Sequence, residues 1–191
     1  LKDFLCTFSN MFALGDPPDY EPRQEDNIEA RAAAAGMSPE SYVYDVMLQN
    51  DGQQLLYFPL SNYGGYNFDI MRDMLVHPRT HMSLSDGGAH VGTVSDANFP
   101  TYTLTHWVRD RDRGERIRLE DAVRKQTGEN AALYGLNDRG LVQVGKKADL
   151  NVIDFEKLHL HAPYMTNDLP KGGKRLLQKA DGYRATVVAG Q

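Results

Sequence analysis

The chain has 191 residues, of which 41% are hydrophobic and 25% charged, which is typical of a soluble globular protein. The formal net charge of −5 argues against a nucleic-acid partner, and no apolar run approaches the roughly 20 residues that a membrane span needs. The single cysteine allows no internal disulfide and favours a reducing compartment, so we expect a cytoplasmic location.

Two helices are predicted in the first quarter of the chain. Asp26 is the expected N-cap of the first helix, with Glu29 as its capping-box partner three residues later. Gly36 is a suitable residue to end that helix. Ser38 and Pro39 then begin the second helix as its N-cap and first helical residue.

The next segments have the order strand, loop, helix, strand. They are a strand at Leu55–Phe58, a glycine-rich loop at 61–67, a helix at Phe68–Leu75 and a strand at Thr80–Leu84. This order predicts a βαβ unit with parallel pairing and a right-handed crossover.

The second half is predicted to be helical first and extended afterwards. Leu104 and Trp107 lie at core positions of the first of these helices, whereas the mixed charges of Arg109–Arg118 indicate a solvated loop. The expected helices are 101–108, 119–125 and 129–134; the expected strands are 141–145, 148–154 and 185–190, with a loop or hairpin at 171–174.

The tract Ser85–His90 is the most informative motif, because an aspartate followed by two glycines ends a predicted strand. In β/α barrels the catalytic groups lie at the carboxyl ends of the strands. Asp86 is therefore a candidate catalytic carboxylate, and the glycines leave the backbone free to turn beside a ligand. The alternative is an aspartate that hydrogen-bonds its own turn.

Two tracts carry a resemblance to a known family. Residues 135–154, with turn points at Gly140 and Gly145, resemble the tail of the amidohydrolase superfamily, and Ser85–Gly88 resembles the end of its last barrel strand. Together with Phe99–Thr101 and Arg124–Thr127, these tracts make the chain similar to the N-acyl-D-amino-acid deacylases, the D-aminoacylase group.

The resemblance implies an α/β fold: the C-terminal fragment of a metal-dependent (β/α)8 barrel (TIM barrel) plus strands of a small flanking β-sandwich. Residues 1–54 would be an inserted or lid helical segment, 55–139 the last βα units of the barrel, and 140–191 the sandwich strands. The family's early His-X-His pair does not occur before Asp86, and the chain opens without Met. We therefore expect the rest of the barrel in an N-terminal portion or a partner chain, and self-association of this stretch alone.

The resemblance also implies a reaction. The full-length enzyme would hydrolyse a linear amide, an N-acyl-D-amino acid, to a carboxylate and a D-amino acid, using one or two zinc ions whose ligands lie mostly outside this chain. Asp86 would be both the catalytic carboxylate and a metal ligand. His90, Tyr63 and Asn62 are candidate substrate-binding residues at the same mouth; a structural histidine and tyrosines that pack over the rim are the alternatives. This stretch alone should be inactive.

Other readings stay open. Related deacylases carry a His-Pro-Arg tract about ten residues after the aspartate, and its arginine helps to hold the substrate carboxylate. Here residues 91–98 contain no arginine, and His77–Arg79 precedes the strand. The substrate could then be a cyclic amide or an N-acyl compound without an α-carboxylate. The other alternative is a non-catalytic binding module that reuses the family's tail. His159 and His161 have His-X-His spacing but lie in that tail, so we do not assign them as the barrel pair.

Overall fold

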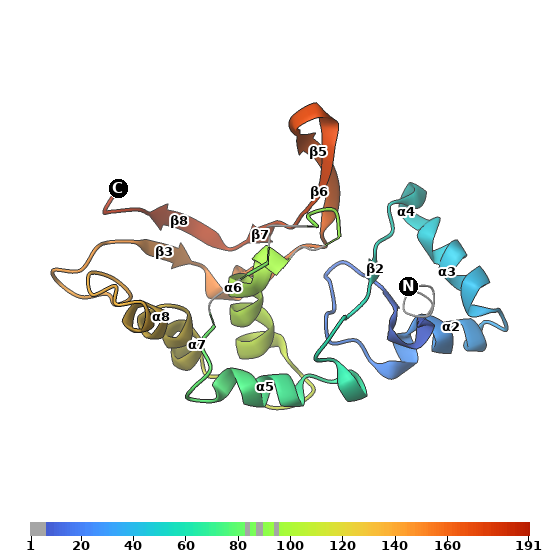
Figure 1. The fold of residues 1–191 in the computed structure, drawn as a ribbon, viewed down its shortest axis with the longest axis horizontal. Helices are drawn as coiled ribbons and strands as arrows, with labels where there is room; N and C mark the ends of the chain where they lie inside the picture. Colours follow the sequence, from blue (N-terminus) through green and yellow to red (C-terminus); the bar gives the residue numbers. More distant parts are fainter. Residues whose placement is uncertain (1–6, 83–84, 87–89, 94–95) are drawn as a thin grey trace. The chain divides into compact units, whose positions relative to one another are not determined.

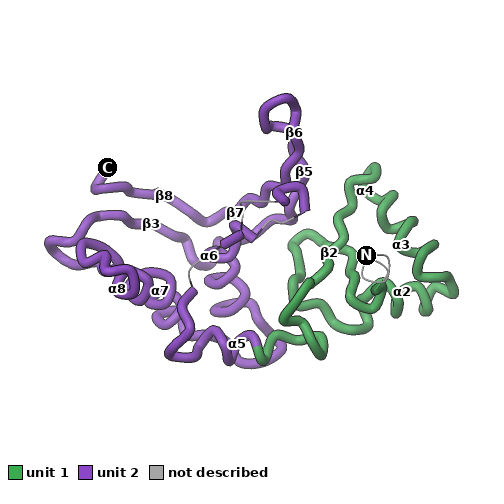
Figure 2. Tube along the Cα trace, in the orientation of Figure 1, with its two compact units in different colours: residues 1–70 green, residues 71–191 purple. Residues whose placement is uncertain are grey.

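A computed structural model describes residues 7–82, 85–86, 90–93 and 96–191. The chain divides into two compact units, residues 1–70 and 71–191 (Figure 2). The helices (Figure 1) are α2 Ile28–Ala34, α3 Pro39–Met47, α4 Gln49–Gly52, α5 Asp69–Val76, α6 Phe99–Tyr102, the π-helical η5 Thr103–Asp110, α7 Leu119–Gln126 and α8 Gly128–Leu133. The strands are β1 Phe12–Ala13, β2 Leu56–Tyr57, β3 Leu150–Ile153, β4 His159–Leu160, β5 Tyr164–Leu169, β6 Gly173–Leu177, β7 Ala180–Asp181 and β8 Tyr183–Val187.

Helix α2 begins one residue later than predicted. Asn27 is the N-cap, and its side-chain oxygen accepts a hydrogen bond from the Ala30 amide at 2.7 Å. The predicted cap, Asp26, instead belongs to a short 3-10 turn, where its carboxylate pairs with Arg31. Aspartate and asparagine are both favoured N-cap residues. Because the 3-10 turn includes Asp26, the next residue, Asn27, takes the N-cap position. Gly36 follows the helix with a φ of +66°, as expected for a helix-ending glycine.

Helix α3 begins as its sequence predicts. The hydroxyl of Ser38 accepts a hydrogen bond from the Ser41 amide at 3.2 Å, and Pro39 occupies the first helical position. Val46 is the buried residue of this helix, whereas Met47 is exposed. The helix thus has a narrower apolar face than its sequence indicated.

The core of the first unit is aromatic. Phe12 is 2% exposed, and the rings of Tyr57, Tyr63 and Tyr66 surround it at centroid distances of 6.2–6.4 Å. Strand β2 confirms the extended prediction for Leu55–Phe58, but it pairs antiparallel with β1. Its partner comes from earlier in the chain, which the local sequence pattern did not reveal.

In the second unit, α6 and η5 form the predicted helix, and Leu104 and Trp107 are buried in it as expected. The predicted solvated loop that follows is wrong at Arg111. This residue is 2% exposed, its guanidinium lies 5.2 Å from the centre of the Trp107 ring, and its Nη1 donates to the Glu115 carbonyl at 2.8 Å. Cation–π contact and hydrogen bonding compensate the burial of this charge.

Helices α7 and α8 confirm the next two predictions. Glu120 and Asp121 lie in the first turn of α7, where acidic side chains complement the helix dipole. Thr127 occupies the N-cap position of α8, but its hydroxyl donates to the Val123 carbonyl at 2.7 Å and makes no capping bond. Gly135, with a φ of +69°, follows the end of α8.

The tail forms three antiparallel pairs, β3 with β8, β4 with β7, and β5 with β6. Figure 1 shows β3 beside β8, and the β5–β6 hairpin, whose turn lies at the predicted place. The strand expected at 141–145 is wrong. Val144 is fully exposed, and the Lys146 amide donates to the Gln143 carbonyl in a turn. In the described structure no strand pairs with this segment, so its alternating pattern is not enough to make it extended.

All strand pairs among the described residues are antiparallel, so the parallel βαβ unit is not formed there. The mixture of helices and strands agrees with the predicted α/β class. Three expectations stay predictions: the (β/α)8 barrel, the assignment of this chain as its C-terminal fragment, and the domain boundaries after residues 54 and 139. Within the described ranges, no helix combines the length and the apolar character needed to cross a membrane.

Gly182 joins β7 to β8 where only glycine fits. Its φ is +97°, and a Cβ at this position would lie 2.6 Å from Leu158 Cα and 2.7 Å from Leu158 N. We expect Gly182→Ala to lower the free energy of unfolding by about 2–3 kcal/mol, because backbone strain and a backbone clash add. Denaturant unfolding of the protein measures the loss.

Gly172 provides the matched control for this substitution. Its φ is +73°, but a Cβ there would meet nothing within 4 Å. Gly172→Ala is therefore expected to cost only the strain of a left-handed residue, about 1 kcal/mol. Equal losses in the two variants would show that the contact with Leu158 contributes nothing.

Candidate functional site

Asp86 is an exposed residue of the second unit. Its backbone carbonyl accepts a hydrogen bond from the Asp96 amide at 3.1 Å, which brings two aspartates together across ten residues of chain. His90 is exposed, has a φ of 55°, and accepts a bond from the Thr93 amide through its carbonyl at 2.8 Å. His90 thus begins a turn at residues 90–93, whereas the backbone of Asp86 is bonded to residue 96.

Asp96 is an acidic neighbour of Asp86 that sequence reasoning did not select. Partial desolvation raises the pKa of the Asp96 carboxyl above its ordinary value of 3.8, and the nearby charge of Asp86 adds to the rise. Ionised Asp96 therefore costs stability in the folded protein. The cost is present at neutral pH and disappears once Asp96 is protonated in both the folded and the unfolded states.

We expect Asp96→Asn to stabilise the chelator-treated protein at pH 7 by about 0.5 kcal/mol, since the group is largely exposed. The sign follows from the raised pKa: the gain is full above the folded-state pKa and vanishes as the pH falls below 3.8. Urea unfolding at pH 7 and pH 3.5 measures it. Asp45→Asn, at an exposed carboxylate on α3, is the control. A gain that persists at pH 3.5, or that Asp45→Asn matches, contradicts the expectation.

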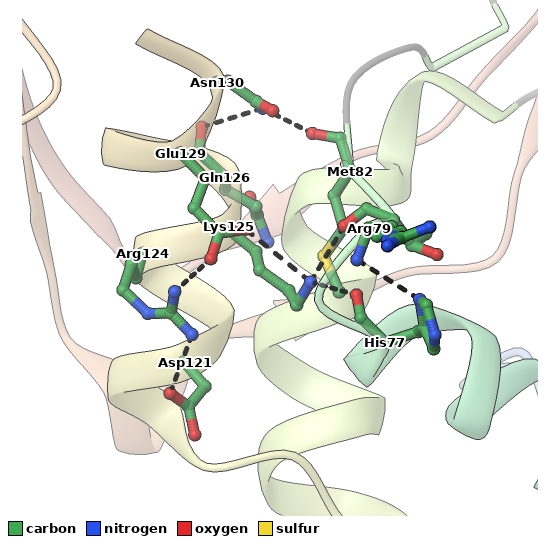
Figure 3. A network of polar contacts seen from close by, with 10 residues as sticks. His77, Arg79, Met82, Asp121, Arg124, Lys125, Gln126, Glu129 and Asn130 are labelled. Atoms are coloured by element: carbon green, nitrogen blue, oxygen red, sulfur yellow. Dashed lines mark hydrogen bonds and ion pairs between the residues drawn. The ribbon is translucent and has the colours of Figure 1, made fainter. Parts of the chain in front are cut away.

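The chain segment that leads to Asp86 is held by side chains of α7 and α8 (Figure 3). Lys125 is only 3% exposed, and its Nζ donates to the carbonyls of His77 at 3.2 Å and Thr80 at 2.9 Å. The Asn130 amide donates to the Met82 carbonyl at 2.5 Å. Three carbonyls of one short segment are therefore bound by two helical side chains.

These contacts explain why the predicted strand at Thr80–Leu84 differs from the structure. Residues 80–82 are not in a strand, and residues 83–84 lie outside the described residues. The carbonyls of Thr80 and Met82, which a strand partner would bind, accept from Lys125 and Asn130. Side-chain donors replace a β-ladder here.

Lys125 also has an acidic partner. Its Nζ lies 3.6 Å from Glu129 Oε2, in the first turn of α8, and the other oxygen of Glu129 pairs with Arg124. Arg124 in turn lies 3.3 Å from Asp121. A buried lysine is tolerated because this carboxylate and the two carbonyls replace its hydration.

Two predicted substrate-binding residues belong to the first unit. Tyr63 is buried, packs edge-on against Phe68 at 4.9 Å between ring centroids, and donates its hydroxyl to the Pro22 carbonyl. Asn62 is exposed and has a φ of 62°. Tyr63 therefore contributes to the aromatic core of the first unit. The roles of Asn62, Tyr63 and His90 as substrate contacts stay predictions.

His159 and His161 form a second histidine-bearing feature, on and just after β4. Their rings lie 4.9 Å apart, and His161 Nε2 is 2.7 Å from an Asp181 oxygen. Both histidines lie in the tail, and His161 Nε2 is engaged by the Asp181 carboxylate there. We therefore keep them apart from the predicted catalytic site.

Comparison with known proteins identifies the family. The amidohydrolase family matches residues 21–191. The chain belongs to the amidohydrolase family. It is 30% identical over 152 residues to an N-acyl-D-aspartate deacylase of Alcaligenes xylosoxydans xylosoxydans. The aligned region is 78% of this chain and 26% of the relative. An uncharacterized protein of Mycobacterium tuberculosis is 29% identical over 165 residues, covering 84% and 26% respectively.

The chain spans about a quarter of the length of these curated amidohydrolase relatives. No solved structure matches it significantly. The resemblance to an amidohydrolase of the D-aminoacylase kind, inferred from residues 85–88 and 135–154, is thus supported by both the family match and a named deacylase relative.

Asp86 and Asp96 place two carboxylates near each other, which is a chemistry that suits a cation. Asp86 offers an exposed carboxylate, and the charge of this group is felt by Asp96. A cation beside two neighbouring carboxylates would relieve their repulsion. One carboxylate supplies a single ligand, whereas a zinc site has three or four protein ligands, so the remaining ligands must come from other residues.

Sequence reasoning missed Lys125, Asn130 and Asp96. The signal for Lys125 was present: it lies three residues after Ala122, so the two share a helical face, and both are buried. A lysine at a buried position of an amphipathic helix indicates a specific partner. Asp96 had no such signal, because its proximity to Asp86 depends on the turn between them.

Proposed function

We propose that the full-length protein that carries this chain is a zinc-dependent hydrolase of linear amides, acting on N-acyl-D-amino acids. The observation that carries the proposal is the exposed carboxylate of Asp86 inside the region that matches the amidohydrolase family. The relative named as an N-acyl-D-aspartate deacylase supports the substrate class. A small-molecule substrate and a cytoplasmic location are parts of the same proposal.

Amide hydrolysis needs a nucleophilic water, a group that polarises the carbonyl and a proton carrier. Zinc, when bound, lowers the pKa of a water molecule to about 7 and polarises the carbonyl oxygen. Asp86 would help to hold the metal and accept a proton from the attacking water. The same carboxyl would then deliver that proton to the leaving nitrogen, so that an amine departs as the C–N bond breaks. His90, two residues after Gly88 in the sequence, would contact the substrate.

The experiment is a substrate survey of the purified full-length enzyme loaded with zinc. N-acetyl-D-amino acids with acidic, polar and apolar side chains are compared with their L-enantiomers by measuring release of the free amino acid. Preferential turnover of the D-series, lost on chelation and restored by zinc, is the expected result. No turnover of any N-acyl amino acid by the zinc-loaded enzyme would contradict the proposal.

A second candidate function is hydrolysis of another C–N bond, in a cyclic amide or an N-acyl compound without an α-carboxylate. The acidic pair favours it, because Asp96 lies beside Asp86 in a region that has no arginine. A carboxylate at this place repels an anionic substrate group. Hydantoins and N-acetyl amines belong in the same survey, and faster turnover of these compounds than of the N-acetyl-D-amino acids would favour the second function.

A further inference from the structure

Residues 77–82 are bound by a lysine whose amine is buried inside the second unit, which is unusual for a charged group. The Lys125 side chain reaches from α7 to two carbonyls three residues apart, His77 and Thr80 (Figure 3). Each is a charge-assisted hydrogen bond, roughly twice as strong as a neutral one. An apolar residue beside Ala122 would fill this helix face without burying a charge, so the lysine serves the segment that it binds.

A second helical side chain continues this anchoring towards Asp86. Asn130 on α8 binds the carbonyl of Met82, and the Met82 side chain is buried. Met82 precedes Asp86 by four residues, so even a fully extended chain places the two Cα atoms no more than about 14 Å apart. The last described anchor therefore lies close along the chain to the proposed catalytic carboxylate.

We propose that Lys125 and Asn130 are positioning residues for Asp86. They hold the backbone of residues 77–82 on α7 and α8, and through it they limit where the Asp86 carboxylate lies. The inference rests on the proposed function, because it assumes that Asp86 carries the reaction. Neither residue touches the substrate. Loss of either anchor should misplace the carboxylate and lower kcat without weakening the binding of substrate.

The test uses the full-length, zinc-loaded enzyme and a substrate that it turns over. Lys125→Met keeps the length and apolar stem of the side chain and removes its three donors. We expect kcat to fall about 10- to 100-fold, the loss that a displacement of about 1 Å at the reacting groups causes. KM is expected to stay within about twofold, because only the transition state uses the misplaced group.

Arg124→Met is the matched control on the same helix. This residue precedes Lys125, carries the same charge, is exposed, and pairs with Asp121 and Glu129. Its kcat and KM are expected to equal those of the wild type. Asn130→Leu is the second test variant, since it removes one hydrogen bond and leaves Lys125 in place. If Lys125→Met does not fold, the kcat of Asn130→Leu tests the positioning role instead.

A double-mutant cycle with Asp86→Asn separates positioning from a general structural effect. When Lys125 acts through Asp86, adding Lys125→Met to Asp86→Asn lowers kcat no further. Independent, multiplicative losses would overturn the inference, as would unchanged kcat in both Lys125→Met and Asn130→Leu. Failure of the proposed function is distinct: in that case Asp86→Asn itself leaves kcat unchanged.

Discussion

Replacing Asp86 by asparagine is expected to lower kcat of the full-length enzyme about 10³-fold, within the range that a general acid–base group contributes. Asparagine keeps the shape of the side chain but cannot accept the proton of the attacking water. It is also a weaker metal ligand than a carboxylate, so zinc content must be measured alongside the rate. Steady-state hydrolysis of the best N-acyl substrate, corrected for bound zinc, is the measurement.

The control is Asp73→Asn, which removes an exposed carboxylate on α5. It changes the net charge by the same amount as Asp86→Asn, and wild-type kcat is expected. Retention of more than about a tenth of the wild-type kcat by zinc-loaded Asp86→Asn would contradict the catalytic role. Restoration of the rate by excess zinc alone would assign Asp86 to metal binding instead.

Local chemistry made part of this fold predictable. Ser38 and Pro39 define the start of α3 with side-chain and backbone preferences that need no distant partner. Gly36 and Gly135 end their helices because a left-handed φ suits glycine. Strands β3 and β8 were both predicted as extended segments, and their ends differ from the prediction by only a few residues.

Features that depend on distant residues were not predictable in this way. The partner of β2 is Phe12–Ala13, more than forty residues earlier in the chain. Residues 141–145 have a strand pattern, but the structure as described gives them a turn instead of a partner. Burial of Arg111 depends on the Trp107 ring and the Glu115 carbonyl, which composition alone cannot bring together.

The candidate site divides in the same way. Asp86 was selected by its place between a predicted strand and two glycines, which is a local signal. Asp96 contacts it from ten residues away, and Lys125 and Asn130 bind the segment before it, Thr80 and Met82, from more than forty residues away. Spacing rules describe one face of one element, whereas these contacts join separate elements.

Replacing Trp107 by alanine is expected to give the largest loss of stability, about 3–5 kcal/mol. The indole is 2% exposed, its ring meets the Arg111 guanidinium at 5.2 Å, and the backbone carbonyl of Trp107 accepts from the Ile117 amide at 2.7 Å. Alanine keeps that backbone bond but leaves a cavity and a buried cation without its aromatic face. The loss would be roughly a fifth or more of the stability of an ordinary domain.

Denaturant unfolding followed by far-UV circular dichroism measures this loss, and two further variants separate its causes. Trp107→Phe keeps an aromatic face for Arg111 and fills part of the volume, so its loss should be no more than about half as large. Tyr134→Ala removes an aromatic ring that is 66% exposed and is expected to change stability by less than about 0.5 kcal/mol. Equal losses in Trp107→Ala and Trp107→Phe would assign the effect to indole shape, and the contact with Arg111 would then contribute little.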